Sequence, residues 1–208
     1  MSDVAAVVLA AGQSSRFRAA GGMEETKLVA PLDGAPIIRR VVGAALASRA
    51  RPVIVVTGHA RAEVERALAG LPVTTAFNSH YAQGLSTSLR AGLAAVPAQA
   101  RGAVVLLGDM PKVDARLIDG LIAAFEGRPL VLAAAPVYNR KRGNPVLLAR
   151  ALFDQAMRAQ GDEGARRLLA ELDSTRLAEI ELAEVGVVFD VDTPNDLASA
   201  RLAKGSGD

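Results

Sequence analysis

The sequence lacks cysteine and tryptophan, has only two histidines in 208 residues, and contains just 3% aromatic residues. Without cysteine there can be no disulfide, no thiolate catalysis and no cysteine-ligated zinc, and two histidines are too few for a histidine-rich metal site. Few aromatic side chains also argue against a stacking platform for single-stranded nucleic acid. The formal net charge is only +2, so no bulk field attracts a polyanion. The sequence therefore predicts no nucleic-acid partner.

Long hydrophobic runs are absent as well. The apolar stretches are short and interrupted by glycine, proline or charge, so none is expected to span a membrane. The first ten residues carry Asp3 and no basic segment, which is unlike a signal peptide. We therefore expect a cytoplasmic protein, a monomer or weak homo-oligomer, with a single domain over residues 1–203 and a disordered tail at 204–208.

Strand-like and helix-like segments alternate along the chain. The predicted strands are Val4–Leu9, Val53–Val56, Val73–Phe77, Ala103–Leu107, Leu130–Ala134, Pro145–Leu148 and Val187–Val191. The predicted helices are Pro36–Leu46, Ala60–Leu68, Thr87–Val96, Leu117–Phe125 with Asp114 as its N-cap, Arg150–Ala159, Glu163–Leu172 and Pro194–Leu202. Because the strands lack alternation, both of their faces should be covered. The pattern predicts an α/β fold: a Rossmann-like, doubly wound, mostly parallel sheet with helices on both faces.

A loop of small residues follows the first predicted strand, at the sheet edge where doubly wound folds bind ligands. Its backbone N–H groups could approach a phosphate closely, and Arg16 and Lys27 could offset the charge of a triphosphate. A tight turn with solvated charges is the alternative interpretation. The loop does not match G-x-G-x-x-G, and no Gly-Lys-Ser/Thr occurs, which disfavours dinucleotide dehydrogenases and P-loop kinases. The candidate phosphate-binding residues are Leu9, Ala10, Ala11, Gly12, Ser14, Ser15 and Lys27.

Two aspartates each follow a predicted buried strand. Asp109 comes after Ala103–Leu107, and Asp192 comes after Val187–Val191. A carboxylate at such a place is costly unless it meets a cation or hydrogen-bond donors, and two hard oxygen ligands suit Mg²⁺. Asp109 could instead be a helix cap or turn residue. Asp190 competes with Asp192 for the second ligand position, because strand alternation puts both on one side.

Further polar residues lie at other strand ends and helix starts. Ser86 and Ser88, with Gly84, precede or begin a helix and could read a base edge or ribose, although ordinary N-capping explains them equally well. Thr57 and Asn78 could contact ribose or base. The basic run Arg140–Arg142 is either a solvated loop or a loop that binds an anionic acceptor. Arg166 is either an acceptor-binding residue or part of a solvated helix face.

Taken in order, these segments resemble the motifs of the MobA-like nucleotidyltransferases, and within that superfamily the molybdenum cofactor cytidylyltransferases. The N-terminal loop resembles the family signature L-A-A-G-x-S-x-R followed by a lysine. The later matching segments are Gly84–Leu93 near the nucleobase, Gly108–Pro111 at the metal, Gly143–Pro145 and Gly161–Arg166 on the substrate side, and the closing motif Asp190–Pro194. The resemblance extends over nearly the whole chain.

Two departures from the family pattern stand out. Arg18 follows Phe17 where the family usually has glycine soon after, and residues 19–26 lengthen the path to Lys27, so Gly21 or Gly22 could supply the displaced turn. Asn144 occupies a position where related sequences often have histidine.

The resemblance implies a Mg²⁺-dependent transfer of CMP from CTP to the terminal phosphate of molybdopterin, with release of pyrophosphate. In this reading Lys27, Arg16 and Asp109 are catalytic, Asp109 and Asp192 bind the metal, and Asn144 and Arg166 contact the acceptor. The resemblance also implies that the protein interacts with an accessory partner of a molybdenum enzyme. The alternatives are a guanylyltransferase or other NTP transferase with a different phosphorylated acceptor, and a non-catalytic accessory protein that hands over a cofactor. The last alternative gives no reason for Lys27, Asp109 and Asp192 to occur together.

Overall fold

The computed structural model describes residues 3–158, 161, 165–182 and 189–202. The predicted tail at 204–208 lies outside these residues. Eight described strands form one sheet: β1 (Val4–Ala10), β4 (Val53–Thr57), β5 (Thr74–Phe77), β6 (Gly102–Leu107), β7 (Ala133–Tyr138), β8 (Lys141–Arg142), β9 (Val146–Ala149) and β10 (Leu177–Glu181). A separate two-stranded sheet pairs β2 (Pro31–Leu32) with β3 (Ala35–Pro36).

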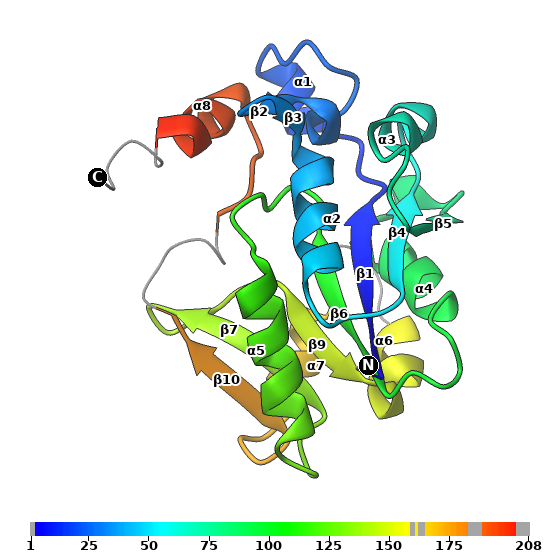
Figure 1. Cartoon of the computed structure of the whole chain (residues 1–208), viewed down its shortest axis with the longest axis vertical. Coiled ribbons are helices and arrows are strands. Elements are labelled where there is room, and N and C mark those ends of the chain that lie inside the picture. The colour runs from blue at the N-terminus through cyan, green and yellow to red at the C-terminus, as the bar shows by residue number, and fades with distance from the viewer. Residues whose placement is uncertain (1–2, 159–160, 162–164, 183–188, 203–208) are drawn as a thin grey trace.

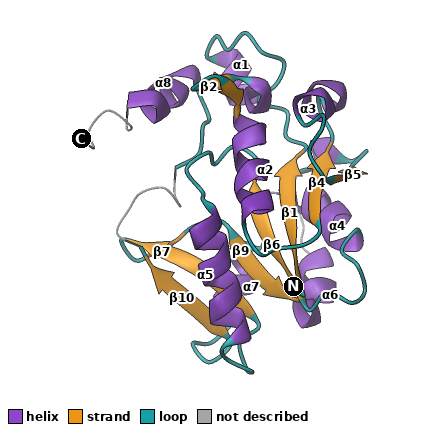
Figure 2. Ribbon diagram, in the orientation of Figure 1, coloured by secondary structure: helices purple, strands orange, loops and turns teal. Residues whose placement is uncertain are grey.

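The strands of the main sheet follow the spatial order β10, β7, β9, β6, β1, β4, β5, with β8 hydrogen-bonded to β7 (Figure 2). β1, β4, β5 and β6 are mutually parallel, and β10 is parallel to β7, whereas β9 runs antiparallel to both β6 and β7. The prediction of a mostly parallel, doubly wound sheet is confirmed. Because β1 and β6 are parallel neighbours, their carboxyl ends meet, and the Gly108 N–H donates to the Leu9 carbonyl at 2.9 Å.

Helices cover both faces of the sheet, as predicted (Figure 1). One face packs against α2 (Ile37–Ala47), α3 (Arg61–Ala67) and α5 (Ala115–Glu126), and the other against α4 (Leu85–Ala94), α6 (Phe153–Met157) and α7 (Arg166–Ala170). The sequence of the central strand β1 is apolar throughout because side chains on both of its faces are buried. Val4, Ala6 and Val8 belong to the first core cluster, while Ala5, Val7 and Leu9 belong to the second. No helix in the described part of the chain is long and apolar enough to cross a bilayer.

A third apolar cluster lies away from the sheet, where α8 (Pro194–Leu202) comes beside β2 and α1 (Ser15–Ala19) (Figure 1). It consists of buried side chains from both ends of the chain: Phe17, Ala30, Leu32, Ile37, Val191, Leu197 and Ala200. Phe17 belongs to the segment that follows the small-residue loop, and Val191 directly precedes Asp192. The cluster therefore fastens the C-terminal segment to the loop after β1.

The structure corrects the predicted strand at Val187–Val191. Residues 187 and 188 lie outside the described residues, and Phe189–Val191 forms no strand. The sheet edge beside β7 is taken instead by β10, a strand that the sequence analysis did not predict. The Val191 N–H donates to the Asp109 carbonyl at 3.0 Å. Asp192 therefore reaches the sheet edge through a loop and not at the end of a strand.

Other boundaries differ less. The strand predicted at Leu130–Ala134 is observed at Ala133–Tyr138, so only its last two residues are confirmed, and Leu130 itself is exposed. The helix predicted at 150–159 consists of a 3₁₀ turn, η3 (Arg150–Leu152), followed by α6, and the helix predicted at 163–172 is described only as the shorter α7. The predicted N-cap of α5 is confirmed, since the Asp114 carboxylate accepts a hydrogen bond from the Leu117 N–H at 2.9 Å.

Candidate active site

A cleft of about 790 Å³ opens beyond the carboxyl ends of β1 and β6. Its walls come from the loop after β1, from Lys27, from the segment Tyr81–Leu85 with Ser88 at the start of α4, and from Asp109, Asp190 and Asp192. This is the edge at which open α/β sheets bind their ligands. The cleft thus collects most of the polar residues that the sequence placed at strand ends.

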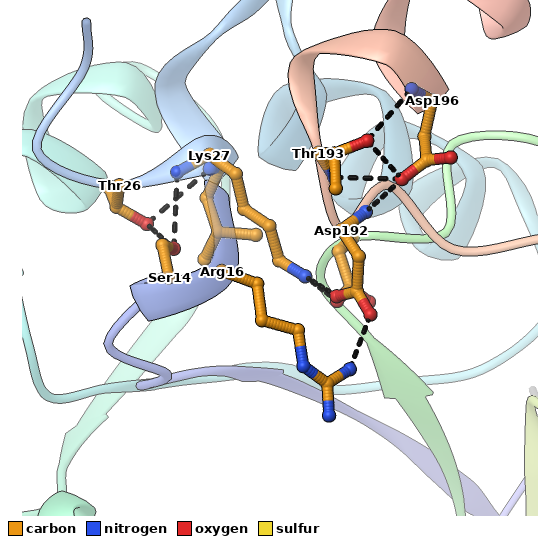
Figure 3. Close-up of polar contacts among 9 residues, drawn as sticks. Ser14, Arg16, Thr26, Lys27, Asp192, Thr193 and Asp196 are labelled. Carbon is orange, nitrogen blue, oxygen red and sulfur yellow. Dashed lines mark hydrogen bonds and ion pairs between the residues drawn. The ribbon is translucent and has the colours of Figure 1, made fainter. Parts of the chain in front are cut away.

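Lys27 lies between two carboxylates in this cleft (Figure 3). Its Nζ atom is 2.7 Å from Asp109 Oδ2 and 2.7 Å from Asp192 Oδ1, and the other oxygen of Asp192 is 2.7 Å from Arg16 Nη1. Burial alone would lower the pKa of Lys27, but Asp109 and Asp192 outweigh it and raise that pKa. Burial would likewise raise the pKa of Asp192, but Lys27 and Arg16 lower it. The pairing therefore favours the charged forms of Lys27 and Asp192.

The backbone around Lys27 is fixed by two hydroxyl groups. Lys27 begins the 3₁₀ helix η1 (Lys27–Val29), and its N–H donates to Ser14 Oγ at 3.1 Å. Ser14 Oγ is also 3.0 Å from the Oγ1 atom of Thr26, a fully buried N-cap that accepts a hydrogen bond from the Leu28 N–H. Ser14 itself has the left-handed φ of 53°. Ser14 thus ties the loop after β1 to the lysine that faces the cleft.

The lengthened path from Arg16 to Lys27 folds as α1 followed by a turn. The chain reverses at Gly21, whose φ of +88° suits glycine, and the Gly22 N–H donates to the Phe17 carbonyl at 2.9 Å. A Cβ atom at Gly22 would lie 2.2 Å from the Phe17 ring, so that ring requires glycine there. Both glycines therefore contribute to the turn that the sequence left open between them.

Three carboxylates that line the cleft come close together. Asp109, Asp190 and Asp192 each offer an oxygen, and these oxygens lie within 4.8 Å of one another. Burial, then the charges of Asp109 and Asp192, raise the pKa of Asp190. Asp109 Oδ1 is buried without a hydrogen-bond partner among the described residues, and such an oxygen is costly to leave unpaired. Hard oxygen ligands at this spacing fit a divalent cation such as Mg²⁺ or Mn²⁺. The structure brings both Asp190 and Asp192 to Asp109.

The Asn78 side chain forms hydrogen bonds to other residues of the protein. Its Nδ2 donates to Thr87 Oγ1 at 2.8 Å and to Ser88 Oγ at 3.0 Å, and its Oδ1 accepts from the His80 N–H at 2.9 Å. Asn78 therefore anchors the start of α4 from the end of β5. Ser86 is also buried, and its N–H donates to the Gly161 carbonyl at 3.0 Å. Thr57 is fully buried, with a hydroxyl that has no partner among the described residues.

The predicted site residues thus divide into two groups. Those that line the cleft are Leu9, Ala11, Gly12, Ser14, Ser15, Arg16, Lys27, Gly84, Ser88, Asp109 and Asp192. Those that do not are Ala10, Thr57, Asn78, Ser86, Asn144 and Arg166. Asn144 is half-buried just before β9, and Arg166 is exposed at the first residue of α7. Residues 162–164 of the motif before Arg166 lie outside the described residues.

Sequence reasoning missed two residues that hold the site together. Thr26 was assigned no role beyond its place in the lengthened path from Arg16 to Lys27, and no local pattern reveals its hydrogen bond with Ser14. Asp196 accepts hydrogen bonds from the Asp192 and Thr193 N–H groups. Here a signal was available, because Thr followed three residues later by an acidic residue is a helix-start pattern.

The chain is similar in sequence and fold to known NTP transferases. The MobA-like NTP transferase domain matches residues 6–177. The molybdenum cofactor cytidylyltransferase of Escherichia coli K12 is 29% identical over 202 residues, which cover 97% of each chain. A nucleotidyl transferase structure from Methanothermobacter has a TM-score of 0.82 and 27% identity, covering 96% of each chain. The manganese complex of Rv0371c from Mycobacterium tuberculosis H37Rv has a TM-score of 0.77 and 25% identity, covering 96% of this chain and 98% of that one.

The crowding of carboxylates predicts a pH-dependent effect of Asp190→Asn. A carboxyl whose pKa is higher in the folded than in the unfolded chain stabilises the fold when protonated, and this stabilisation is lost as pH rises through the folded pKa. Removing the charge should therefore raise the thermal midpoint in EDTA at neutral pH. The gain should disappear below pH 3.8, the ordinary Asp value, where the unaltered carboxyl is protonated too.

Thermal unfolding of both proteins at the two pH values measures this effect. Glu25→Gln removes one negative charge from an exposed loop residue and controls for net charge. A lower midpoint for Asp190→Asn at neutral pH would show that the carboxylates do not repel one another as inferred.

Proposed function

This chain belongs to the MobA-like NTP transferase family, and from that premise we propose that it transfers CMP from CTP to the phosphate of a molybdopterin-type acceptor. The proposed reaction requires Mg²⁺ and releases pyrophosphate. The observation that carries the proposal is the meeting of Lys27, Asp109 and Asp192 at the end of a small-residue loop in one cleft. Simple nucleotide binding does not require two metal-binding carboxylates beside a buried lysine.

The proposed chemistry is an in-line attack by an acceptor phosphate oxygen on the α-phosphorus of CTP. The bond from the α-phosphorus to the bridging oxygen breaks, and pyrophosphate leaves with that oxygen. A phosphate oxygen is already a nucleophile, so no serine, cysteine or histidine nucleophile is needed. Positioning and charge neutralisation then supply most of the catalysis.

The residues of the cleft suit these tasks. Ala11, Gly12 and Ser15 line it with small side chains, so their backbone is accessible to a phosphate. Asp109 and Asp192, with Asp190 beside them, would hold Mg²⁺, which supplies charge neutralisation at the attacking and leaving oxygens when bound. The Arg16 side chain is 80% exposed, so it can turn from Asp192 towards a triphosphate with little loss of packing.

The Lys27 ammonium can pair with either of two sets of anions: the two aspartates, or the phosphates of the nucleotide. Its side chain is only 13% exposed and lies between Asp109 and Asp192. Once these carboxylates have another counter-ion, the ammonium is free to pair with a triphosphate. Asp109 and Asp192 raise the pKa of Lys27 against the effect of burial, so the ammonium is charged while it pairs with them. This dual use explains how one lysine can serve both the empty and the loaded site.

Two observations support CTP as the donor and molybdopterin as the acceptor. Gly84 and Ser88 give the cleft a small, polar wall at the start of α4, which suits a compact pyrimidine edge. The similarity to a molybdenum cofactor cytidylyltransferase over 97% of the chain favours the same base and acceptor. We also propose Asn144 and Arg166 as acceptor contacts outside the cleft wall.

A pyrophosphate-release screen tests the function. It crosses the four NTPs with molybdopterin and several phosphorylated acceptors, with and without Mg²⁺. The expected result is release with CTP, molybdopterin and Mg²⁺ together. Better turnover with GTP would make the protein a guanylyltransferase. Absence of release with every pair would favour the accessory protein that hands over a cofactor.

Asp109→Asn tests the metal site within that reaction. Asparagine keeps the shape of the side chain, so the variant should fold, but Mg²⁺-dependent pyrophosphate release should fall on the order of 100-fold. Asp114→Asn is the matched control, because asparagine also caps helices and Asp114 lies on the same loop outside the cleft lining. If Asp109→Asn keeps both its activity and its dependence on magnesium, Asp109 does not bind the metal and is only a turn residue.

Lys27→Ala should affect both turnover and stability. Loss of a well-placed donor commonly lowers the rate on the order of 100-fold. The variant also leaves Asp109 and Asp192 without their buried counter-ion, so its thermal midpoint in EDTA should fall and Mg²⁺ should restore much of the loss. Arg128→Ala, which removes a positive charge from an exposed residue after α5 and outside the cleft lining, is the control. A folded variant with normal turnover would contradict the catalytic role of Lys27. A thermal midpoint that does not rise when Mg²⁺ is added would contradict its role as a counter-ion.

A further inference from the structure

The start of α8 carries a reciprocal set of hydrogen bonds (Figure 3). Asp196 Oδ2 accepts from the Thr193 N–H at 2.7 Å and from Thr193 Oγ1 at 2.8 Å. In return, the Asp196 N–H donates to Thr193 Oγ1 at 3.2 Å. This is the arrangement of a capping box, with aspartate in the place of the usual glutamate.

The same carboxylate oxygen does more than cap the helix. Asp196 Oδ2 also accepts from the backbone N–H of Asp192 at 3.1 Å. Asp192 is the residue whose side chain meets Lys27 and Arg16. One oxygen of Asp196 therefore fixes the backbone from which this carboxylate projects.

No strand performs that task, because Phe189–Val191 is not part of the described sheet. Asp192 is held by the Val191 N–H, which donates to the Asp109 carbonyl at 3.0 Å, and on its other side by Asp196. The adjoining side chains Val191 and Leu197 are buried against Phe17 in the third apolar cluster. The match to the family domain ends at residue 177, before all of these C-terminal residues.

We propose that Asp196 is a positioning residue that sets Asp192 for binding a divalent cation, so that α8 is part of the active site. The inference rests on the metal site of the proposed function. A ligand whose orientation depends on an outer hydrogen bond loses metal affinity when that bond is removed, commonly by 10–100-fold. A purely structural cap would change stability and leave metal affinity unchanged.

The chain contains a matched control for this distinction. Asp173 Oδ1 accepts from the Thr175 N–H at 2.9 Å, from the Thr175 hydroxyl and from the Arg176 N–H at 3.2 Å. These are the same kinds of donor that Asp196 receives. Asp173 lies just before β10 and does not line the cleft. Asp173→Ala thus removes a similar set of bonds away from the carboxylates.

The experiment is a Mn²⁺ titration of the nucleotide-free, full-length protein, in which the paramagnetic resonance signal of free Mn²⁺ gives the affinity. Asp196→Ala should weaken Mn²⁺ binding about 10-fold or more. Asp196→Asn keeps an acceptor oxygen and should recover most of that loss, and Asp173→Ala should bind as the unaltered protein does. Thermal unfolding of the three variants shows how much of each effect is a general loss of stability.

The outcomes separate this inference from the proposed function. Unchanged Mn²⁺ affinity in Asp196→Ala, or an equal loss in Asp173→Ala, overturns the positioning role and leaves the metal site standing. If the unaltered protein takes up no Mn²⁺, or if Asp109→Asn binds it equally well, the proposed metal site is wrong and this inference fails with it.

Discussion

The ammonium of Lys27 lies between the carboxylates of Asp109 and Asp192, and the rest of the site is arranged around that pairing. Two carboxylates this close would repel one another without a cation, and one would tend to stay protonated. The fold brings each partner from a different place: Asp109 from the end of β6, Asp192 from the segment before α8, and Lys27 from a 3₁₀ turn. The third apolar cluster then joins the loop after β1 to the C-terminal segment.

The compensation by Lys27 is incomplete. Asp190 adds a third carboxylate, and its pKa is raised first by burial and then by the negative charges of Asp109 and Asp192. Asp109 also keeps one buried oxygen without a hydrogen-bond partner among the described residues. A site with surplus negative charge and an unused oxygen is suited to a cation of higher charge than an ammonium. The surplus negative charge at these three aspartates therefore suits a divalent cation.

The sequence predicted those features that follow from local pattern and from parallel topology. Asp109 was placed correctly at the cleft because an apolar strand ends just before it and parallel strands share one edge. The sequence also placed Asp192 at this cleft, but on the basis of a predicted strand. The described residues Phe189–Val191 form a loop instead, and this loop is joined to the end of β6 by the hydrogen bond from the Val191 N–H to the Asp109 carbonyl. The pairings of Lys27 with carboxylates and of Asn78 with Thr87 and Ser88 depend on three-dimensional contacts that residue spacing does not encode.

The most direct test of the metal site is a crystal structure of the protein with CTP and Mn²⁺, with the ion located by its anomalous scattering. We expect Mn²⁺ bound by Asp109 and Asp192, with the Nζ atom of Lys27 moved from these carboxylates to a phosphate oxygen. An ion located elsewhere, with Lys27 still 2.7 Å from both aspartates, would contradict it.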